Sequence, residues 1–542
     1  MTTNIAETLD AVARDHGPAI GLVEVRSGRE VSFAELSRRS SAYARYLQQR
    51  GVRPGDRTML MVRPSADFIC LTFALFKLGA PVILIDPGMG YANLRRCIAG
   101  VSPWVLIGIP QALVFARLFR KAFATVRHSF CCGFSGGIFG PDISRAIARD
   151  EGDFPCHVPA ADDLAAIIFT TGSTGPPKGV RFEHAIFAAQ LRLIREYYGI
   201  TAADVDQPAF PLFALFSTAL GARAIIPDMD PTRPVQVNPA RFIASINRHQ
   251  VTYSFGSPAL WNVVSRYCLH NKIVLPSLHK VLMAGAPVPG ELLERVRAIL
   301  PAGAVIHTPY GATESLPIVS MTGDEILTAT WPLSRQGRGT CVGRALPGIE
   351  IKVIRLVDGV IADISGVEEL PPGKIGEIIV RGDVVTRAYD HNEAETRLAK
   401  IRDGETLWHR MGDTGYRDAE GRLWFCGRKA HRVVTLQETL YTIPCEAIVN
   451  EHPDVYRSAL VGIPSAAEPA VQEAVLIVQP HETSRPEAEL LAEVRELAGR
   501  HPLTRDIRHF LIHRDFPVDI RHNAKIFREK LAVWAATRVK TA

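Results

Sequence analysis

Strand-like and helix-like runs alternate along most of the first 430 residues of this 542-residue chain. Runs typical of helices occur at 36–50 and 291–299. Runs typical of short strands occur at 58–62, 281–283 and 305–307. Strands that alternate with helices in this way usually pair in parallel, with the helices packed on the faces of the sheet. The pattern therefore predicts an α/β fold with layered parallel sheets.

The texture of the chain changes twice after this region. Short strands separated by Gly, Pro and Asp turns predominate over about 345–427, and a mixture of strands and helices follows Gly427-Arg428-Lys429. Since 542 residues exceed the size of one small core, we expect a large N-terminal domain over 1–427 and a small α+β domain over 428–542. The stretch 345–427 is expected to be a small β-rich subdomain of the first.

Charge and cysteine content argue against several classes of protein. The 62 basic and 56 acidic residues give a net charge of +6, without zinc-finger spacing or a long basic tail, so nucleic acid is not an expected partner. The nine cysteines are scattered without a Cys-x-x-Cys motif, which is typical of reduced structural thiols in a cytoplasmic protein.

Neither a signal peptide nor a membrane span is predicted. The first residues lack a basic start followed by an apolar run. The longest apolar stretch, 68–85, is interrupted by Lys77, a glycine and a proline. It predicts a buried helix over 68–78 followed by a buried strand over 81–85.

A segment rich in Gly, Ser and Thr lies between a strand-like run at 165–169 and a helix-like run from His184. It reads Thr170-Thr171-Gly172-Ser173-Thr174-Gly175-Pro176-Pro177-Lys178-Gly179-Val180. Glycine N–H groups and hydroxyls donate to anions, and a lysine adds positive charge. Because Lys178 is not followed by Ser or Thr, this is not the usual mononucleotide loop. It predicts a polyphosphate site, and a flexible surface loop is the alternative.

Three other segments carry side chains suited to a nucleotide. Tyr310-Gly311-Ala312-Thr313-Glu314 follows a predicted strand, where α/β sheets place ligands. Glu314 suits Mg²⁺ and Thr313 suits a phosphate oxygen, with a helix cap as the alternative. We interpret 408–416 as a Gly/Asp turn in which Asp413 accepts ribose hydroxyls, with an Asx turn as the alternative. Arg428 follows a predicted strand and can add a contact.

In this order the segments resemble the acyl-adenylate-forming superfamily of acyl-CoA synthetases, luciferases and adenylation domains. The resemblance covers nearly the whole chain and implies ATP and Mg²⁺ at the junction of a large domain and a small mobile one. It implies a phosphate loop made by Thr170, Thr171, Gly172, Ser173, Thr174, Gly175 and Lys178. It further implies adenine contacts from Gly285, Ala286, Pro287 and Tyr310, and a cofactor contact from Gly311. Thr313 is expected to contact phosphate, Glu314 to hold Mg²⁺, and Asp413 and Arg428 to hold the ribose. Lys525 matches the lysine that bridges the carboxylate and the α-phosphate.

The chain departs from that family where an acceptor thiol would bind. Ala430 stands where a hinge Asp or Lys is usual, and 433–439 lacks the glycine of the loop that lines the pantetheine tunnel. These differences argue against CoA as the acceptor. The segment 210–216 resembles the gate of the acyl pocket and implies pocket residues Phe213, Ala214 and Phe216, with Ala214 in place of the common His.

The run 519–531 resembles the C-terminal signature of the β-lactone synthetases of bacterial long-chain olefin biosynthesis. It implies activation of a long-chain 2-alkyl-3-hydroxy acid and ring closure by the 3-hydroxyl of the substrate, together with a complex with other hydrocarbon-biosynthesis enzymes. A long-chain acyl-CoA or acyl-carrier ligase is the second hypothesis. The third is a non-catalytic acyl-nucleotide or membrane-docking scaffold.

A basic amphipathic helix is predicted over 111–128. One face carries Phe115, Phe119, Ala122, Phe123 and Val126, and the basic residues lie largely off that face: Arg117, Arg120, Lys121 and Arg127. The favoured interpretation is a helix packed on its own protein, with the arginine stems along its apolar surface. Docking on a membrane surface or a partner is the alternative.

Two other chemistries are disfavoured. The run 133–137 matches Gly-x-Ser-x-Gly, but no strand–turn–helix pattern surrounds it. The seventeen histidines form no His-Glu-x-x-His motif, so a zinc site is not indicated.

Overall fold

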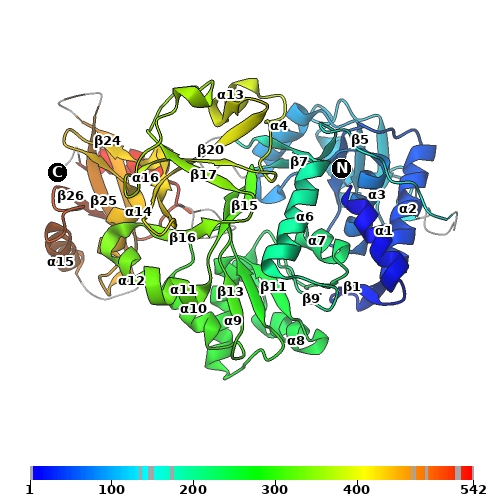
Figure 1. Ribbon diagram of the computed structural model, residues 1–542, viewed down its shortest axis with the longest axis horizontal. Coiled ribbons are helices and arrows are strands. Elements are labelled where there is room, and N and C mark those ends of the chain that lie inside the picture. The colour runs from blue at the N-terminus through cyan, green and yellow to red at the C-terminus, as the bar shows by residue number, and fades with distance from the viewer. Residues whose placement is uncertain are drawn as a thin grey trace.

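The computed structural model describes residues 4–133, 137–144, 152–170, 176–465, 468, 471–481, 486–518 and 526–539. It has the predicted α/β class, with two mostly parallel sheets and an antiparallel sheet in a large N-terminal part, and a smaller α+β part at the C-terminus (Figure 1). The C-terminal part lies at the left end of the view, and the N-terminal part fills the centre and the right. The exact boundary at 427/428 remains a prediction.

The first sheet has the order β6-β5-β3-β4-β7-β8, and all neighbours are parallel except β7 and β8. Its helix α3 (Ala66–Leu78) confirms the predicted buried helix, since Ser65 caps its start and Gly79, at φ +72°, ends it before β4. The strands are β3 (Thr58–Met61), β4 (Val82–Leu84), β5 (Val105–Gly108), β6 (His128–Cys131), β7 (Leu164–Phe169) and β8 (Gly179–Glu183).

The second sheet has the order β13-β12-β11-β9-β10-β1-β2 and is parallel apart from the β1–β2 pair. Its strands are β1 (Ile20–Glu24), β2 (Arg29–Ser32), β9 (Val205–Asp206), β10 (Arg223–Ile226), β11 (Tyr253–Gly256), β12 (Lys280–Met283) and β13 (Val305–His307). The helices of this region are α1 (Ile5–His16), α2 (Phe33–Gln49), α6 (His184–Tyr198), α7 (Phe213–Ala219), α8 (Pro239–His249), α9 (Pro258–His270) and α10 (Gly290–Arg297).

The third sheet is antiparallel, in the order β14-β15-β16-β21-β20-β18-β17 with β19 beside β20. Its strands are β14 (Tyr310–Ala312), β15 (Ser315–Ser320), β16 (Thr340–Ala345), β17 (Glu350–Ile354), β18 (Gly376–Arg381), β19 (Lys400–Asp403), β20 (Thr406–Arg417) and β21 (Leu423–Arg428). The prediction of a Gly/Asp turn at 408–416 was wrong, because these residues belong to β20. Gly412, at φ +65°, lies where the pairing of β20 with β18 shifts register.

The C-terminal part contains a three-stranded sheet in the order β24-β25-β26 and a short hairpin. Its elements are β22 (Val433–Val434), β23 (Thr439–Leu440), α14 (Thr442–Val449), β24 (Val455–Pro464), β25 (Gln472–Pro480), α15 (Glu487–Gly499), β26 (His509–Ile512) and α16 (Arg528–Val539). These strands and helices agree with the mixture that the sequence predicts after residue 429.

The prediction of one helix over 111–128 was wrong. Helix α5 (Pro110–Leu118) ends early, turns follow, and β6 begins at His128. The ring of Phe115 lies 4.7 Å from that of Phe119 and 6.1 Å from that of Phe123, so the apolar side chains fold onto one another rather than along one helix. This packing confirms that the apolar residues contact their own protein.

Membrane-spanning segments and disulfides were sought in the described part of the chain. None of its helices is both long enough and apolar enough to traverse a bilayer. All nine cysteines fall within this part, and each is a free thiol. The motif at 133–137 lies mostly outside the described residues.

Lys77, which interrupts the apolar stretch, is fully buried. Its Nζ lies 2.7 Å from Oδ1 of Asp10 and donates to Oγ of Ser41 at 2.9 Å. This contact ties α3 to α1 and α2 inside the first hydrophobic core. A buried charge of this kind is tolerated only while its partner remains.

We expect Lys77→Ala to lower the free energy of unfolding by about 3–5 kcal/mol, because it leaves the Asp10 carboxylate without its cation. Urea denaturation followed by tryptophan fluorescence measures the change. The exposed Lys121→Ala is the control, with an expected change below about 0.5 kcal/mol. Equal midpoints for the two variants would contradict the assigned role of Lys77.

Candidate active site

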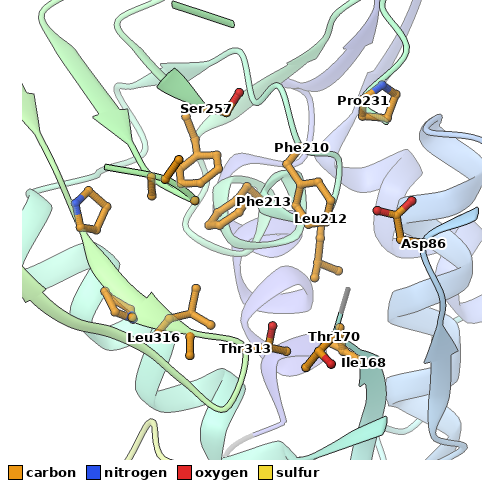
Figure 2. Close-up of a pocket in the computed structure, with 18 of the residues that line it drawn as sticks. Asp86, Ile168, Thr170, Phe210, Leu212, Phe213, Pro231, Ser257, Thr313 and Leu316 are labelled. Atoms are coloured by element: carbon orange, nitrogen blue, oxygen red, sulfur yellow. The ribbon is translucent and has the colours of Figure 1, made fainter. Parts of the chain in front are cut away.

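A cavity of about 2130 Å³ opens where the carboxyl ends of β7, β11 and β12 meet the hairpin β14–β15. Figure 2 shows Thr170 and Thr313 at one end of it, with Leu212 and Phe213 between them and Ser257. Ligands of α/β sheets bind at the carboxyl ends of strands. The cavity therefore occupies the position expected for a substrate site.

Most of the predicted site residues line this one cavity although they come from distant parts of the chain. They are Thr170, Lys178, Phe213, Phe216, Gly285, Ala286, Pro287, Tyr310, Gly311, Thr313, Glu314, Asp413 and Arg428. Thr171, Gly172, Ser173, Thr174, Gly175 and Lys525 lie outside the described residues. The individual roles of all these residues remain predictions.

Ala214 is not brought to the cavity wall. It is fully buried in the first hydrophobic core, whereas Phe213, Phe216 and Ser217 face the cavity. Residues three and four apart share one face of a helix, and the next residue along points about a quarter turn away. The position of Ala214 corrects its prediction as a pocket residue.

The loop that contains the predicted phosphate contacts is closed at its base by β7 and β8. The N–H of Thr170 donates to the carbonyl of Lys178 at 3.0 Å, and the N–H of Lys178 donates to Oγ1 of Thr170 at 3.1 Å. The Lys178 Nζ lies 2.5 Å from Oε2 of Glu395 and 5.1 Å from the ring centre of Tyr389. Because this ion pair is only partly buried, it contributes little stability and leaves the lysine beside the cavity.

Glu314 lies in the tight turn between β14 and β15. Tyr389 donates its hydroxyl to Oε1 of Glu314 at 2.6 Å and so orients the carboxylate. Gly311 is required in the hairpin because a Cβ there would lie 2.5 Å from the carbonyl oxygen of Ser315. The alternative of a helix cap at Thr313 was wrong, since a strand pair occupies this position.

The buried Lys400 stabilises the Glu314 turn through Thr386. Thr386 donates its N–H and its hydroxyl to the carbonyl of Glu314, at 2.9 and 3.1 Å. Lys400 in turn donates to the carbonyl of Thr386. Burial lowers the pKa of Lys400 to about 7, and Glu314 and Glu183 oppose that shift. The turn is thus fixed through both its backbone and its side chain.

Asp413, Tyr310 and Arg428 meet on three different strands. The Tyr310 hydroxyl donates to Oδ2 of Asp413 at 2.5 Å, and Nη1 of Arg428 lies 3.0 Å from Oδ1. Burial raises the pKa of Asp413, and the charge of Arg428 opposes that effect. Despite the short distance, Oδ1 receives no properly directed hydrogen bond from the described residues. An acceptor left in this way fits the hydroxyl of a nucleoside ribose.

Four residues that support the predicted site residues, directly or through one another, were missed at the sequence level. They are Thr386, Tyr389, Glu395 and Lys400, which lie between β18 and β20. No spacing or motif marks them. Thr386 and Tyr389 contact Glu314, and Glu395 contacts Lys178, across 70 or more residues of sequence. Lys400 acts through Thr386.

The side of the cavity formed by α7 is aromatic and also contains a buried acid. The rings of Phe213 and Phe255 stack at 3.9 Å. Beyond them, Asp206 accepts a hydrogen bond from the Ser217 hydroxyl, which accepts one from Tyr253 at 3.1 Å. Burial raises the pKa of Asp206 to about 7. Asp206, Ser217 and Tyr253 all border the cavity.

The model of the family described as AMP-binding enzyme matches residues 9–390, more than half of the chain. The chain belongs to this family. Its relatives include two olefin beta-lactone synthetases. The one from Xanthomonas campestris is 44% identical and covers 99% of this chain and 98% of its own. The one from Stenotrophomonas maltophilia is 43% identical, and the match covers 94% of this chain and 92% of that protein.

Solved structures support the fold of this AMP-binding enzyme. Amide bond synthetase McbA from Marinactinospora thermotolerans aligns with a TM-score of 0.80 at 22% identity, covering 98% of this chain and 99% of its own. ATP-bound MatB from Rhodopseudomonas palustris aligns with a TM-score of 0.77 at 22% identity, covering 98% of this chain and 99% of the MatB chain. At this identity the likeness concerns the fold alone.

We expect Lys400→Met to destabilise the protein by about 1–3 kcal/mol, because the buried Thr386 carbonyl loses its donor. Thermal unfolding of the ligand-free protein measures this loss. Lys352→Met, which removes a partly exposed ion pair with Glu369, is the matched control and should cost less than about 1 kcal/mol. A neutral Lys400→Met would contradict the supporting role of this lysine.

Asp206 should make stability depend on pH. Its folded-state pKa of about 7 exceeds the ordinary value of 3.8, so the folded state binds more protons between these values. The stabilisation is complete below about pH 4 and is lost as the pH rises through 7, by at most about 1.4 kcal/mol per pH unit. We expect Asp206→Asn to flatten this dependence in urea denaturation at pH 4–8. The exposed Asp162→Asn should keep it, and identical profiles for both variants would refute the assignment.

Proposed function

We propose that this AMP-binding enzyme is an ATP-dependent β-lactone synthetase. It adenylates the carboxylate of a long-chain 2-alkyl-3-hydroxyalkanoic acid, and the 3-hydroxyl of the same molecule then closes a β-lactone. The observation that carries the proposal is 44% identity, over nearly the full length of both chains, to an olefin beta-lactone synthetase. We place the reaction in long-chain olefin and hydrocarbon biosynthesis.

AMP-binding enzymes use ATP with Mg²⁺, and the residues around the cavity fit both. We assign the ribose hydroxyls to Asp413, whose Oδ1 lacks a hydrogen bond from the described residues. Glu314 offers a carboxylate oriented by Tyr389, and a hard oxygen ligand of this kind suits Mg²⁺. When bound, the metal ion neutralises phosphate charge and so favours attack at the α-phosphorus.

In the first step a carboxylate oxygen of the acid attacks the α-phosphorus of ATP, and pyrophosphate leaves. Both reactants are anionic, so cations at the site must offset their repulsion. Lys178 lies at the base of the phosphate loop and is assigned to the phosphates, with Thr313 donating to a phosphate oxygen. Lys525 is assigned to bridge the carboxylate and the α-phosphate, by resemblance.

In the second step the 3-hydroxyl oxygen attacks the acyl carbon, gives up its proton, and AMP leaves with the electrons of the broken acyl–phosphate bond. An aligned intramolecular nucleophile can act with an effective molarity of roughly 10⁵–10⁸ M, which helps to overcome ring strain. Residues 433–440 form a short hairpin closed by Thr435 and Glu438 without any glycine, which fits the absence of a CoA step.

The division of the chain and its partners remain further proposals. We propose that 428–542 is a mobile domain, that 345–427 is a subdomain of the larger one, and that the enzyme acts beside other hydrocarbon-biosynthesis enzymes. An acid substrate agrees with the family. Peripheral contact with a membrane is also proposed.

We expect the purified enzyme, given a long-chain 2-alkyl-3-hydroxy acid and Mg-ATP, to release AMP and pyrophosphate and to form a β-lactone without CoA. Mass spectrometry identifies the product, and a pyrophosphate assay gives the rate. Strict dependence on CoA would instead establish the alternative of an acyl-CoA ligase.

Lys525→Ala tests the assignment of the adenylating lysine. We expect pyrophosphate release to fall by at least about 100-fold, because charge at the α-phosphorus loses its stabilising cation. Lys530→Ala is the control, since Lys530 lies on α16, 4.9 Å from the ring centre of Phe527, and has no assigned role. Unchanged pyrophosphate release in Lys525→Ala would remove that lysine from the mechanism.

A further inference from the structure

The net charge of the chain is concentrated in one stretch. Residues 87–141 contain six basic residues and no Asp or Glu. The rest of the chain holds 56 residues of each sign, so the whole net charge of +6 belongs to these 55 residues. The basic residues are Arg95, Arg96, Arg117, Arg120, Lys121 and Arg127.

All six cations are exposed, and none forms an ion pair with the residues that the structure describes. Three of them cover aromatic rings instead. Arg95 lies 4.8 Å from the ring centre of Phe119, Arg117 lies 4.7 Å from that of Phe139, and Arg127 lies 5.5 Å from that of Trp104. Their positive charge is therefore not neutralised by this part of the protein.

Large apolar side chains project between these cations. Tyr91 on α4 (Tyr91–Val101) and Leu118 on α5 are each 73% exposed, and Val114 is 40% exposed. The rings of Tyr91 and Phe115 lie 5.9 Å apart and join the two helices. We define the α4–α5 patch as Tyr91, Arg95, Arg96, Val114, Arg117, Leu118, Arg120 and Lys121.

The helices that carry the patch also form a wall of the cavity. Leu94 on α4 and Ala112 on α5 line it, together with Met59 and Leu84 of the first sheet. Leu94 and Met59 belong to the hydrophobic cluster on which Phe115 packs, and Leu84 packs against the first core. The α4–α5 patch is thus the outer surface of the apolar side of the substrate cavity.

We propose that the α4–α5 patch docks this enzyme on an anionic lipid bilayer and that the long-chain acid passes from the bilayer into the cavity beside α4 and α5. The delivery step rests on the proposed function, whereas the docking does not. Basic residues interleaved with exposed aromatic and aliphatic side chains bind the interface of anionic membranes. An acidic protein surface would attract the cations but gives no reason for Tyr91 and Leu118 to be so exposed.

Flotation of the full-length protein with vesicles tests the docking without ATP or acid. We expect binding to vesicles of phosphatidylglycerol mixed with phosphatidylcholine, little binding to phosphatidylcholine alone, and loss of binding in 1 M salt, where screening shortens the reach of charge to about 3 Å. Failure of the wild-type protein to bind the anionic vesicles would overturn the proposal.

The triple variant Arg96→Gln/Arg120→Gln/Lys121→Gln should lower the vesicle partition coefficient by about 100-fold. The matched control is Arg248→Gln/Arg266→Gln/Lys272→Gln, three exposed cations on or next to α8 and α9, at the opposite edge of the molecule from α4 (Figure 1). It should bind as the wild type does. Equal losses in both triple variants, or none in the first, would reject the patch.

Tyr91→Ser/Leu118→Ser tests the apolar contribution and should also weaken binding, while the exposed positions preserve the fold. For delivery, the first triple variant should turn over vesicle-borne long-chain acid more slowly, with unchanged pyrophosphate release on a soluble short-chain 3-hydroxy acid. Equal rates on the vesicle-borne acid would refute the delivery step. Inactivity of every protein, including the wild type, would instead count against the proposed function and leave the flotation result standing.

Discussion

The geometry of the site depends on one extended segment, residues 385–390, that joins two of the sheets. Asp390 and Ala388 exchange backbone hydrogen bonds with β8, the strand that follows the predicted phosphate loop. Thr386 binds the carbonyl of Glu314. The Asp390 carboxylate also accepts two hydrogen bonds of 2.8 Å from Arg57, next to β3. Because these contacts are backbone or bidentate, they hold Lys178 and Glu314 in one relative position.

That constraint explains why a buried lysine is tolerated at Lys400. Its Nζ binds the carbonyl of Thr386, in the middle of the crossing segment. A buried amine is costly to charge, which is why its pKa falls to about 7, yet it satisfies a carbonyl that the strands leave without a partner. The polar groups here fix the position of the Glu314 turn, and the cavity beside Phe213 and Phe255 is lined by aromatic rings.

Helices α4 and α5 contact the cavity on one side and solvent on the other. The inward side chains of α4 and α5 are apolar and meet the first sheet, and the outward ones combine cations with exposed Tyr91 and Leu118. The overall net charge alone could not reveal the α4–α5 patch, because +6 in 542 residues is small. Its confinement to 55 residues is visible in the sequence, but its position over the cavity is a property of the fold.

The sequence by itself determined the α/β class, the helices and strands with clear periodicity, and the order of motifs that defines the family. These are encoded locally, in spacings of about two or 3.6 residues and in turn residues. Only the tertiary structure decided that 408–416 is a bulged strand, that 111–128 is not one helix, that Ala214 faces the core, and that Tyr389 and Lys400 support Glu314. The physical reason is that strand pairing and burial depend on partners remote in the sequence, which override local propensity.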